Sequence, residues 1–430
     1  MGTDEKTTQP SSDGERMLII GSSQSGVALS GSLRALGWEG EIVLLGDEDH
    51  RPYQRPALSK EFLQGRIDKE KLIFRAQEYW DEHRIQVIPG QRITSIETSP
   101  DGGTAHAESG ESFSFDRLAL AVGARARRLE IEGSELDGVL YLRNADDALE
   151  LKARMPEAQR VVVVGGGFIG LEAAASARTV DKQTAVIDAG PRLVARAVGE
   201  TTSEHLLQVH RREGTEVLLE AGIARFVGSD GRVIGVELDD GRVVEADIVL
   251  VGIGVVPNVE LAESMGLEVD NGIVVDEYAL ASDGRTIAIG DCANIPNPVP
   301  GSPSGERLRL ESVNNAVEHA KVAAYSAMGR HEEYRSIPWF WSNQGNHKLQ
   351  MAGLSMGADQ EVVRLDGTDD KLCVLYYRKG RLIAADTVNS PVDFMAVKNA
   401  LAAGRTIPPE RAADTSVRLK ELITDMGDPA

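Results

Sequence analysis

Cysteine is scarce in this sequence of 430 residues, which contains only Cys292 and Cys373. Two cysteines do not make a disulfide framework, and they do not make a cysteine-rich metal site. We therefore expect a protein without structural disulfides and a functional site without a metal ion.

Long apolar runs and targeting signals are also missing. No apolar stretch approaches the roughly 20 residues that cross a membrane, although 42% of the residues are apolar, enough for several cores. The segment Met1 to Glu15 is polar and lacks the basic-then-apolar order of a signal peptide. Lys6 stands where a myristoylation motif requires Ser or Thr. We expect a soluble cytoplasmic protein, not bound to membranes, in which residues 1–14 form a disordered tail.

Positive charge is in short supply, with 46 Lys and Arg residues against 67 Asp and Glu residues and a formal net charge of −21. Nucleic-acid affinity comes mostly from neutralised phosphates, so this balance argues against a nucleic-acid partner. A local basic patch that docks an acidic protein stays possible under the same balance.

The most informative stretch present runs from Arg160 to Glu172. Its β-branched run Val161 to Val164 is typical of a strand buried on both faces of a parallel sheet. The run leads into Gly165-x-Gly167-x-x-Gly170 and an Ala-rich segment that favours helix. In such a turn one glycine makes the tight bend, one lets the backbone approach a pyrophosphate, and one allows close helix packing.

A second short strand, Thr184 to Ile187, then ends at Asp188, near the spacing expected for the acid that binds an adenosine ribose. Strand, turn, helix, second strand and acid together predict a dinucleotide site, with an ordinary glycine turn as the alternative.

The same layout occurs near the N-terminus. Met17 to Ile20 is followed by Gly21-Ser-Ser-Gln-Ser-Gly26, a helix-like segment, and the strand Glu41 to Leu45 with acids at Asp47 and Glu48. Ser23 stands where the second glycine is expected, and its hydroxyl could donate a hydrogen bond to a phosphate. We predict a second dinucleotide site here, with a degenerate turn as the alternative.

Strand-like runs separate and follow the two nucleotide units. The first unit is followed by two runs that resemble strands of an antiparallel sheet, Gln91 to Glu97 and Ser112 to Val122. A similar series of strand-like runs follows the second unit, and its last run is Val243 to Val251. This order predicts a duplicated α/β architecture. The last hundred residues lack a glycine phosphate loop. They predict an antiparallel sheet covered by one helix, Pro391 to Ala402.

These features resemble the NADH-dependent ferredoxin reductases of bacterial oxygenase and cytochrome P450 systems, which belong to the FAD-dependent pyridine nucleotide oxidoreductases. The resemblance extends from about Met17 to Ile423. Its most specific motifs are Arg51-Pro-Tyr-Gln-Arg-Pro-Ala-Leu-Ser-Lys60, Gly165-Gly-Gly-Phe-Ile-Gly-Leu-Glu172, Gly252-Ile-Gly-Val-Val-Pro-Asn258, Gly290-Asp-Cys-Ala293, Glu311-Ser-Val313 and Pro338-Trp-Phe-Trp-Ser342.

The resemblance implies two Rossmann-like dinucleotide-binding domains, for FAD and NAD, and a C-terminal α+β domain. The implied boundaries are 15–121 with 247–330 for a discontinuous FAD domain, 122–246 for the NAD domain, and 331–430 for the C-terminal reductase domain.

Site residues follow from the same motifs. Lys60 would lie beside the flavin N5 edge, paired with Glu172, and these two are the expected catalytic residues. Asp291 would bind the ribityl chain, or else act as a helix N-cap. The expected FAD-binding residues are Gly21, Ser23, Ser25, Gly26, Glu48 (with Asp47 as the alternative), Lys60, Ile93, Arg143, Asp291, Val313 and Trp341. The expected NAD-binding residues are Gly165, Gly167, Phe168, Ile169, Gly170, Glu172 and Asp188.

Asp188 also predicts the choice of nucleotide. An acid there disfavours the 2′-phosphate of NADPH, and Ala189-Gly190 places no arginine directly after it. We therefore expect NADH, although Arg192 lies close in sequence.

The function that the resemblance implies is electron transfer from NADH through FAD to an acidic [2Fe-2S] ferredoxin. The expected assembly is a monomer or weak dimer. Alternatives are a rubredoxin reductase, an NADH oxidase, and an apoptosis-inducing-factor-like flavoprotein that NADH switches. Disulfide reduction is disfavoured, because no cysteine lies between Met1 and Asp291.

Some positions depart from the family pattern. Ser23 and Asn314 replace a glycine and a proline, and Val122 stands where the family has Thr. In Ser342-Asn-Gln-Gly345, Asn343 and Gly345 differ from the family's Ser-Asp-Gln-Tyr.

Overall fold

The computed structural model describes residues 14–299, 303, 305–365 and 368–425. Most of the predicted tail, residues 1–13, lies outside the described part. The chain divides into two compact units. The first comprises residues 1–54, 73–125 and 257–336, and the second comprises residues 55–72, 126–256 and 337–430. The three-domain division expected from the sequence stays a prediction.

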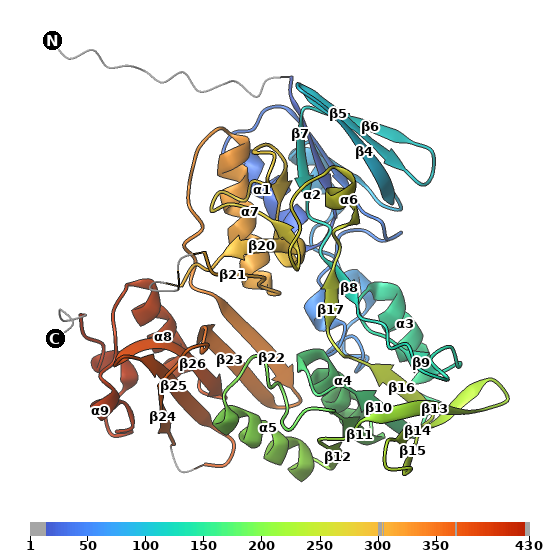
Figure 1. Ribbon diagram of the computed structural model, residues 1–430, viewed down its shortest axis with the longest axis vertical. Helices are drawn as coiled ribbons and strands as arrows, with labels where there is room; N and C mark the ends of the chain where they lie inside the picture. The colour runs from blue at the N-terminus through green and yellow to red at the C-terminus, as the bar shows by residue number, and fades with distance from the viewer. Residues whose placement is uncertain (1–13, 300–302, 304, 366–367, 426–430) are drawn as a thin grey trace. The chain divides into compact units, whose positions relative to one another are not determined.

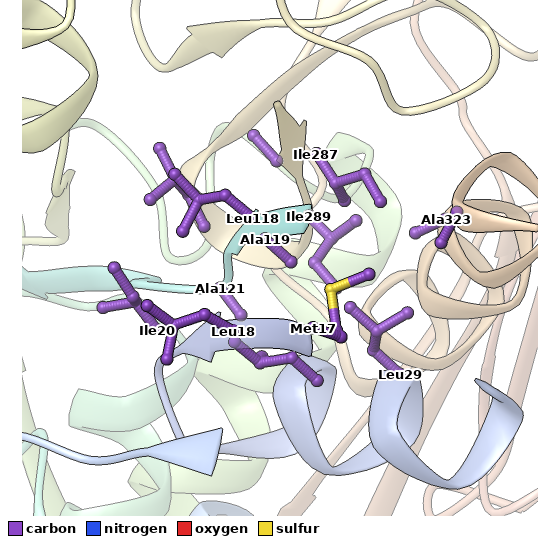
Figure 2. Close-up of a cluster of buried hydrophobic side chains, with 14 of the residues drawn as sticks. Met17, Leu18, Ile20, Leu29, Leu118, Ala119, Ala121, Ile287, Ile289 and Ala323 are labelled. Atoms are coloured by element: carbon purple, nitrogen blue, oxygen red, sulfur yellow. The ribbon is translucent and has the colours of Figure 1, made fainter. Parts of the chain in front are cut away.

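The first unit is built on a five-stranded parallel sheet, in the order β19-β7-β1-β2-β3. Its strands are β1 (Arg16–Ile20), β2 (Glu41–Leu45), β3 (Ile85–Ile88), β7 (Arg117–Leu120) and β19 (Ile287–Ala288). Helices α1 (Gln24–Ala35) and α7 (Val313–Ala327) lie side by side against it (Figure 1). Their apolar faces share a core with the sheet, to which α1 contributes Leu29 and α7 contributes Ala323 (Figure 2).

Smaller elements complete the first unit. An antiparallel sheet consists of β4 (Ile93–Ser99), β5 (Gly102–Ala107) and β6 (Ser112–Phe115). A second three-stranded sheet consists of β18 (Ile273–Val274), β20 (Ala293–Pro296) and β21 (Arg307–Leu308). The remaining elements are α2 (Gln77–Glu82), α6 (Glu260–Ser264) and η3 (Gly290–Cys292).

The second unit contains a matching parallel sheet, in the order β12-β11-β10-β16-β9. Its strands are β9 (Val139–Leu140), β10 (Arg160–Val164), β11 (Gln183–Ile187), β12 (Thr215–Leu218) and β16 (Ile248–Val251). Val161 and Val163 belong to one buried cluster, and Val162 and Val164 belong to another. Strand β10 is therefore buried on both faces, as its unbroken β-branched run predicts.

Other elements of the second unit surround this sheet. Helix α4 (Phe168–Thr179) packs on it, and an antiparallel excursion consists of β13 (Ile223–Ser229), β14 (Arg232–Leu238) and β15 (Val243–Glu245). The others are η1 (Arg55–Ala57), η2 (Lys69–Leu72), α3 (Ala145–Arg154) and α5 (Glu200–Arg212). Strands β8 (Ala124–Ala126) and β17 (Val255–Pro257) lie at the sequence boundaries of the units.

The C-terminal part of the second unit is an antiparallel sheet in the order β22-β23-β26-β25-β24, as expected. Its strands are β22 (Trp339–Gln344), β23 (His347–Gly353), β24 (Gln360–Arg364), β25 (Leu372–Arg378) and β26 (Arg381–Val388). One face packs on the predicted helix α8 (Pro391–Ala402), with α9 (Pro409–Ala412) and η4 (Leu419–Glu421) nearby in sequence. The other face joins the core around β10, since Leu349 and Val374 share a cluster with Val161.

Two sequence predictions are wrong in the same way. The segments 112–122 and 243–251 were each expected to form one strand, but each splits into two strands in different sheets. The breaks come at Asp116 and at Ala246-Asp247. Asp116 Oδ2 accepts from the backbone N–H of Arg16 at 2.6 Å, and Asp247 Oδ2 accepts from that of Arg160 at 2.9 Å. Each aspartate thus connects the end of an antiparallel sheet to a strand of a parallel sheet, β1 for Asp116 and β10 for Asp247.

Candidate functional site

The central glycine turn connects β10 to α4, and its three glycines meet different constraints. Gly165 has φ +107°, and an added Cβ would lie 2.4 Å from the carbonyl oxygen of Gly252. At Gly170 a Cβ would lie 2.2 Å from the carbonyl oxygen of Gly165. At Gly167, the residue that precedes α4, the nearest atom would be 4.0 Å away. The outer glycines therefore make the bend and the packing, and the middle one leaves open space beside the first N–H groups of the helix.

Asp188 follows β11 directly, and its carboxylate joins two loops. Oδ2 accepts from the backbone N–H of Gly166, and Oδ1 accepts from that of Gly190, both at 2.6 Å. The carboxylate thus lies next to the glycine turn, as a ribose-binding acid should. Arg192 donates to the carbonyl oxygens of Val198 at 2.7 Å and Ala195 at 2.8 Å. Its guanidinium therefore holds the following loop together, which weakens the case for a phosphate-binding arginine here.

The first residues of α4 are aromatic and apolar. The ring of Phe168 lies tilted against Phe340 of β22, with the ring centroids 4.6 Å apart. Ile169 is exposed, with 45% of its surface accessible. The sequence predicts NAD contacts for both, and those contacts stay a prediction.

The turn of the first unit has the same construction. Gly21 has φ +113°, and a Cβ on Gly26 would lie 2.0 Å from the carbonyl oxygen of Gly21. Ser23 is the N-cap residue of α1 and has φ −89°, which is ordinary extended backbone for any residue. The serine is therefore compatible with the turn itself. Ser25 is buried, and a Cβ on Gly290 would lie 2.8 Å from its hydroxyl oxygen. The loop that carries Asp291 thus passes close to the start of α1.

The acid after β2 has a different place from Asp188. The residue directly after β2 is Gly46, where a Cβ would lie 2.2 Å from the Ser22 hydroxyl oxygen. Glu48, two residues further on, accepts a 2.5 Å hydrogen bond from the hydroxyl of Tyr53. Asp47, the alternative, is exposed.

The remaining predicted FAD residues have varied surroundings. Helix α7 begins at Val313, and its N-cap Ser312 accepts from the backbone N–H of Asn315 at 3.0 Å. Asp291 lies in η3, and its carbonyl oxygen accepts from Arg309 at 3.0 Å. Ile93 is 8% exposed and belongs to the core of the first unit, so its side chain serves packing.

Two further predicted FAD residues lie in the second unit. The N–H of Arg143 donates to Asp147 at 2.7 Å. Trp341 is half-buried on β22 and stacks with Trp339, with the ring centroids 5.5 Å apart.

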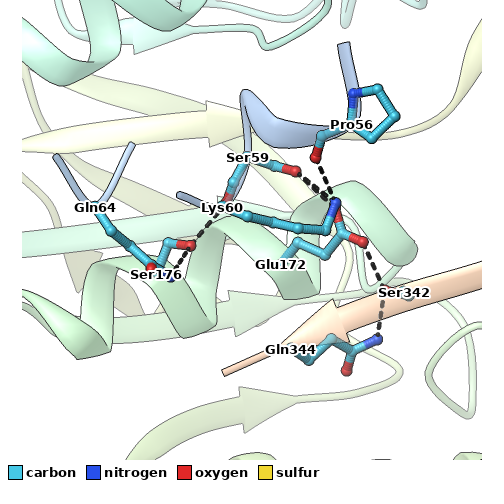
Figure 3. A network of polar contacts seen from close by, with 8 residues as sticks. All are labelled: Pro56, Ser59, Lys60, Gln64, Glu172, Ser176, Ser342 and Gln344. Carbon is cyan, nitrogen blue, oxygen red and sulfur yellow. Dashed lines mark hydrogen bonds and ion pairs between the residues drawn. The ribbon is translucent and has the colours of Figure 1, made fainter. Parts of the chain in front are cut away.

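Lys60 and Glu172 form a buried ion pair, as expected. Lys60 Nζ lies 2.5 Å from Glu172 Oε2, and the two side chains are 8% and 2% exposed (Figure 3). Glu172 is on α4, two residues after the third glycine, and Lys60 is on the segment 55–72, which groups with the second unit. Lys60 also donates to the carbonyl oxygen of Pro56 at 2.7 Å. Buried pairs contribute little net stability, because desolvation offsets their attraction, so the arrangement points to chemistry.

The sequence did not predict the groups that surround this pair. The hydroxyl of Ser59 donates to Glu172 Oε2 at 2.6 Å, and that of Ser342 donates to Oε1 at 2.7 Å (Figure 3). Gln64 donates to Ser176 at 3.0 Å, and Ser176 donates to the carbonyl oxygen of Ser59 at 2.7 Å. The available signal was that Ser59 adjoins Lys60 and that Ser342 ends the tryptophan motif. Neither fact indicates contact with Glu172.

Both cysteines are buried and form no disulfide. Burial raises the pKa of Cys292 to about 11 and also raises that of Cys373. Both thiols are therefore protonated near neutral pH, unlike the thiolates that redox centres use.

Comparison with known proteins identifies the family. The model of the pyridine nucleotide-disulphide oxidoreductases matches residues 15–320, and a model described as reductase C-terminal matches residues 339–423. The chain belongs to the pyridine nucleotide-disulphide oxidoreductase family. Membership implies binding of FAD and of a nicotinamide dinucleotide.

Named relatives confirm the resemblance to ferredoxin reductases of oxygenase systems. Rhodocoxin reductase of Rhodococcus erythropolis is 43% identical over 407 residues, covering 95% of this chain and 94% of the relative. The crystal structure of the ferredoxin reductase for the CYP199A2 system from Rhodopseudomonas palustris is 37% identical with a TM-score of 0.90, covering 95% of this chain and all of that one. The putidaredoxin reductase chain of a covalent complex with putidaredoxin is 34% identical with a TM-score of 0.89, covering 95% and 98%.

The α/β fold with its two parallel Rossmann-like sheets and C-terminal antiparallel sheet agrees with these structures. Within residues 14–299, 303, 305–365 and 368–425, the helices are all too short or too polar to span a membrane.

Proposed function

We propose that the chain transfers electrons from NADH through FAD to a [2Fe-2S] ferredoxin that serves an oxygenase such as a cytochrome P450. The observation that carries this proposal is the buried ion pair of Lys60 and Glu172. Glu172 lies on the helix that begins at the second glycine turn, so the pair and the expected NADH site share one rigid element. The names of the relatives support the same reaction.

Each glycine turn is proposed to hold the pyrophosphate of one nucleotide. The turn at 21–26 would hold FAD on the N-terminus of α1, and the turn at 165–170 would hold NADH on the N-terminus of α4. The open space at Gly167 supports the second assignment. In this account residues 15–121 and 247–330 form the FAD domain, and residues 122–246 form the NAD domain.

Bound FAD supplies the chemistry of accepting an electron pair from NADH and releasing electrons singly. The protein supplies position and charge. Lys60 would hold a positive charge beside the flavin N5 edge, and Glu172 would keep the ammonium in place. The N-terminus of α7 at Val313 would present N–H groups and the positive helix end to the C2 carbonyl of the flavin.

We propose NADH as the electron donor in preference to NADPH. The carboxylate of Asp188 lies beside the turn and would repel a 2′-phosphate. Arg192 is occupied by two backbone carbonyl groups, so it does not offset this repulsion.

The proposed partner is an acidic [2Fe-2S] ferredoxin, and the proposed assembly is a monomer or weak dimer. A solved relative is a covalent complex of putidaredoxin reductase with putidaredoxin, which supports a small redox protein as the acceptor. Because this chain has a net charge of −21, attraction to an acidic partner requires a local basic patch.

A steady-state screen tests the proposal. The purified protein should contain FAD and should oxidise NADH rapidly when a suitable [2Fe-2S] ferredoxin is present. Turnover should be slower with NADPH, with rubredoxin, and with oxygen alone. Fast turnover that needs only oxygen would identify an NADH oxidase, and faster turnover with rubredoxin would identify a rubredoxin reductase.

A further inference from the structure

A line of buried hydrogen bonds leads away from Glu172 through β22 to α5. Ser342 and Gln344 are two residues apart on β22, so their side chains lie on the same face of the strand. They are 0% and 1% exposed. Gln344 Nε2 lies 3.2 Å from the hydroxyl oxygen of Ser342 (Figure 3), and Gln344 Oε1 lies 2.9 Å from Nε2 of His210. His210 is 3% exposed on α5. The line therefore joins the ion pair to a buried histidine.

The direction of every hydrogen bond in this line depends on the imidazole of His210. If Nε2 carries the proton, it donates to Gln344 Oε1, and the amide N–H of Gln344 donates to Ser342. The hydroxyl proton of Ser342 is then free to go to Glu172, at 2.7 Å. If Nδ1 carries the proton instead, Nε2 can only accept. The amide then turns over, Ser342 donates to its oxygen, and Glu172 loses a donor.

We propose that His210, as the Nε2–H tautomer, is a positioning residue that directs the Ser342 hydroxyl proton to Glu172 and so fixes the Lys60–Glu172 pair for flavin reduction. This inference rests on the proposed function of that pair. Its physical reason is that Glu172 then receives donors on both oxygens, from Ser342 on one and from Lys60 and Ser59 on the other. Donors on both oxygens restrict the rotation of the carboxylate.

The surroundings of His210 favour a neutral ring. The direction of the hydrogen bonds therefore depends on which ring nitrogen carries the proton and not on the charge of the ring. Burial lowers the pKa of His210 most, and the electrostatic interaction with His347 lowers it further. The hydrogen bond to Gln344 and the negative charge of Glu213 act in the opposite direction without overcoming burial. His347 and Glu213 bond to each other at 3.0 Å.

The first test reads the tautomer directly. The protein would be labelled with ¹⁵N-histidine, and long-range ¹H–¹⁵N spectra would assign the protonated nitrogen of each ring near neutral pH. His210→Gln identifies the signals of His210 by their loss. We expect Nε2–H for His210, and an Nδ1–H tautomer would overturn the proposal. This result does not depend on activity, on the nucleotide or on the partner.

The second test separates a donor from a packing group. The amide of His210→Gln can place an N–H donor near the original Nε2, whereas His210→Met fills similar space without a donor. The rate of flavin reduction by NADH would be measured anaerobically in single turnovers for both variants. We expect the Gln variant to match the parent and the Met variant to be about tenfold slower, the effect of one hydrogen bond to a charged group. The Kd for NADH should be unchanged.

The outcomes are distinguishable from failure of the proposed function. If the Met variant reduces its flavin as fast as the parent, or if the Gln variant is as slow as the Met variant, His210 does not act as a donor and the proposal is wrong. If the parent itself is not reduced by NADH, the proposed function fails, and the tautomer measurement still decides the hydrogen-bond direction. That measurement also decides the matter if the Met variant does not fold.

Discussion

The two glycine turns share one backbone but carry different side chains. Strands β1 and β10 and helices α1 and α4 have the same lengths and the same spacing, so Gly21, Ser23 and Gly26 correspond to Gly165, Gly167 and Gly170. In each copy the N–H of the first glycine donates to the last residue of the next strand at 2.8 Å. The φ angles at Ser23 and Gly167 are −89° and −80°. The backbone is therefore duplicated in detail.

The copies differ at the positions that would decide function. Gly46 in the first copy corresponds to Asp188 in the second, so the acid of the first copy shifts to Glu48. Ala28 corresponds to Glu172, so only the second copy carries half of the buried ion pair. The same backbone frame therefore occurs twice, and only the second copy also carries the residue proposed to act beside the flavin.

The largest expected effect is at the position where the copies differ most. Replacing Glu172 with Leu leaves the Lys60 ammonium buried without its carboxylate, which should lower the free energy of unfolding by about 3–5 kcal/mol. Chemical denaturation measures this. The double variant Lys60→Met, Glu172→Leu should recover most of the stability while flavin reduction stays slow. In the first copy Ala28→Ser should cost about 1 kcal/mol or less. Equal losses of unfolding free energy for the Glu172 and Ala28 variants would contradict this difference between the copies.

The next largest effect is expected at the last glycine of each turn, a position at which the two copies agree. Gly26→Ala and Gly170→Ala place a Cβ at 2.0 and 2.2 Å from a carbonyl oxygen, and each should destabilise by about 1–3 kcal/mol. Gly167→Ala, whose Cβ would lie 4.0 Å from the nearest atom, is the matched control. The copies should separate in binding, because Gly26→Ala should lose flavin absorbance whereas Gly170→Ala should keep its flavin and bind NADH weakly. Loss of flavin from Gly170→Ala alone would reverse the assignment of the turns.

A moderate effect on nucleotide preference is expected at Asp188, the acidic residue that follows β11 in the second copy. Asp188→Ala with Ala189→Arg removes a repelling carboxylate and adds a cation, so the ratio of kcat/KM for NADH to that for NADPH should fall about tenfold or more. Asp188→Ala alone should weaken NADH binding without gaining NADPH, since the N–H groups of Gly166 and Gly190 lose their acceptor. Equal kcat/KM for both nucleotides in the parent enzyme would remove the basis of this prediction.

The smallest effect is expected from Ser23→Gly, which makes the two turns alike. This variant should keep its FAD, because the extended backbone at this position suits either residue. Ser23→Val is the contrasting variant, and it should lose most of its FAD by crowding the phosphate. Flavin content per protein after desalting measures both. A valine variant as yellow as the parent would show that the pyrophosphate lies elsewhere.

Much of the fold can be predicted from the sequence, because many of its elements are marked by patterns of neighbouring residues. The glycine turns, the β-branched run Val161 to Val164 and the helix at Pro391 are all local signals, and the structure has elements at each. The runs 112–122 and 243–251 were expected to be single strands, but each breaks beside an aspartate, Asp116 or Asp247. Each aspartate accepts a hydrogen bond from a strand residue 100 or 87 positions away in sequence, which the local pattern does not show.

The candidate site was predicted only in part for the same reason. The Lys60–Glu172 pair follows from a family resemblance, but Ser342 and His210 reach it through folding of the whole second unit. Side chains alternate between the two faces of β22, and this separates the residues at the end of the strand. Ser342 and Gln344, which match the family pattern, point to the ion pair, whereas Asn343 and Gly345, which depart from it, do not take part.

The most direct test of the central claim is an anaerobic double-mixing experiment. The protein is first mixed with one equivalent of NADH and then with an oxidised [2Fe-2S] ferredoxin, while flavin and ferredoxin absorbance are followed. We expect NADH to bleach the flavin and ferredoxin to restore its absorbance, with two ferredoxins reduced per NADH because each takes one electron. A bleached flavin that is restored only when oxygen is admitted would contradict it.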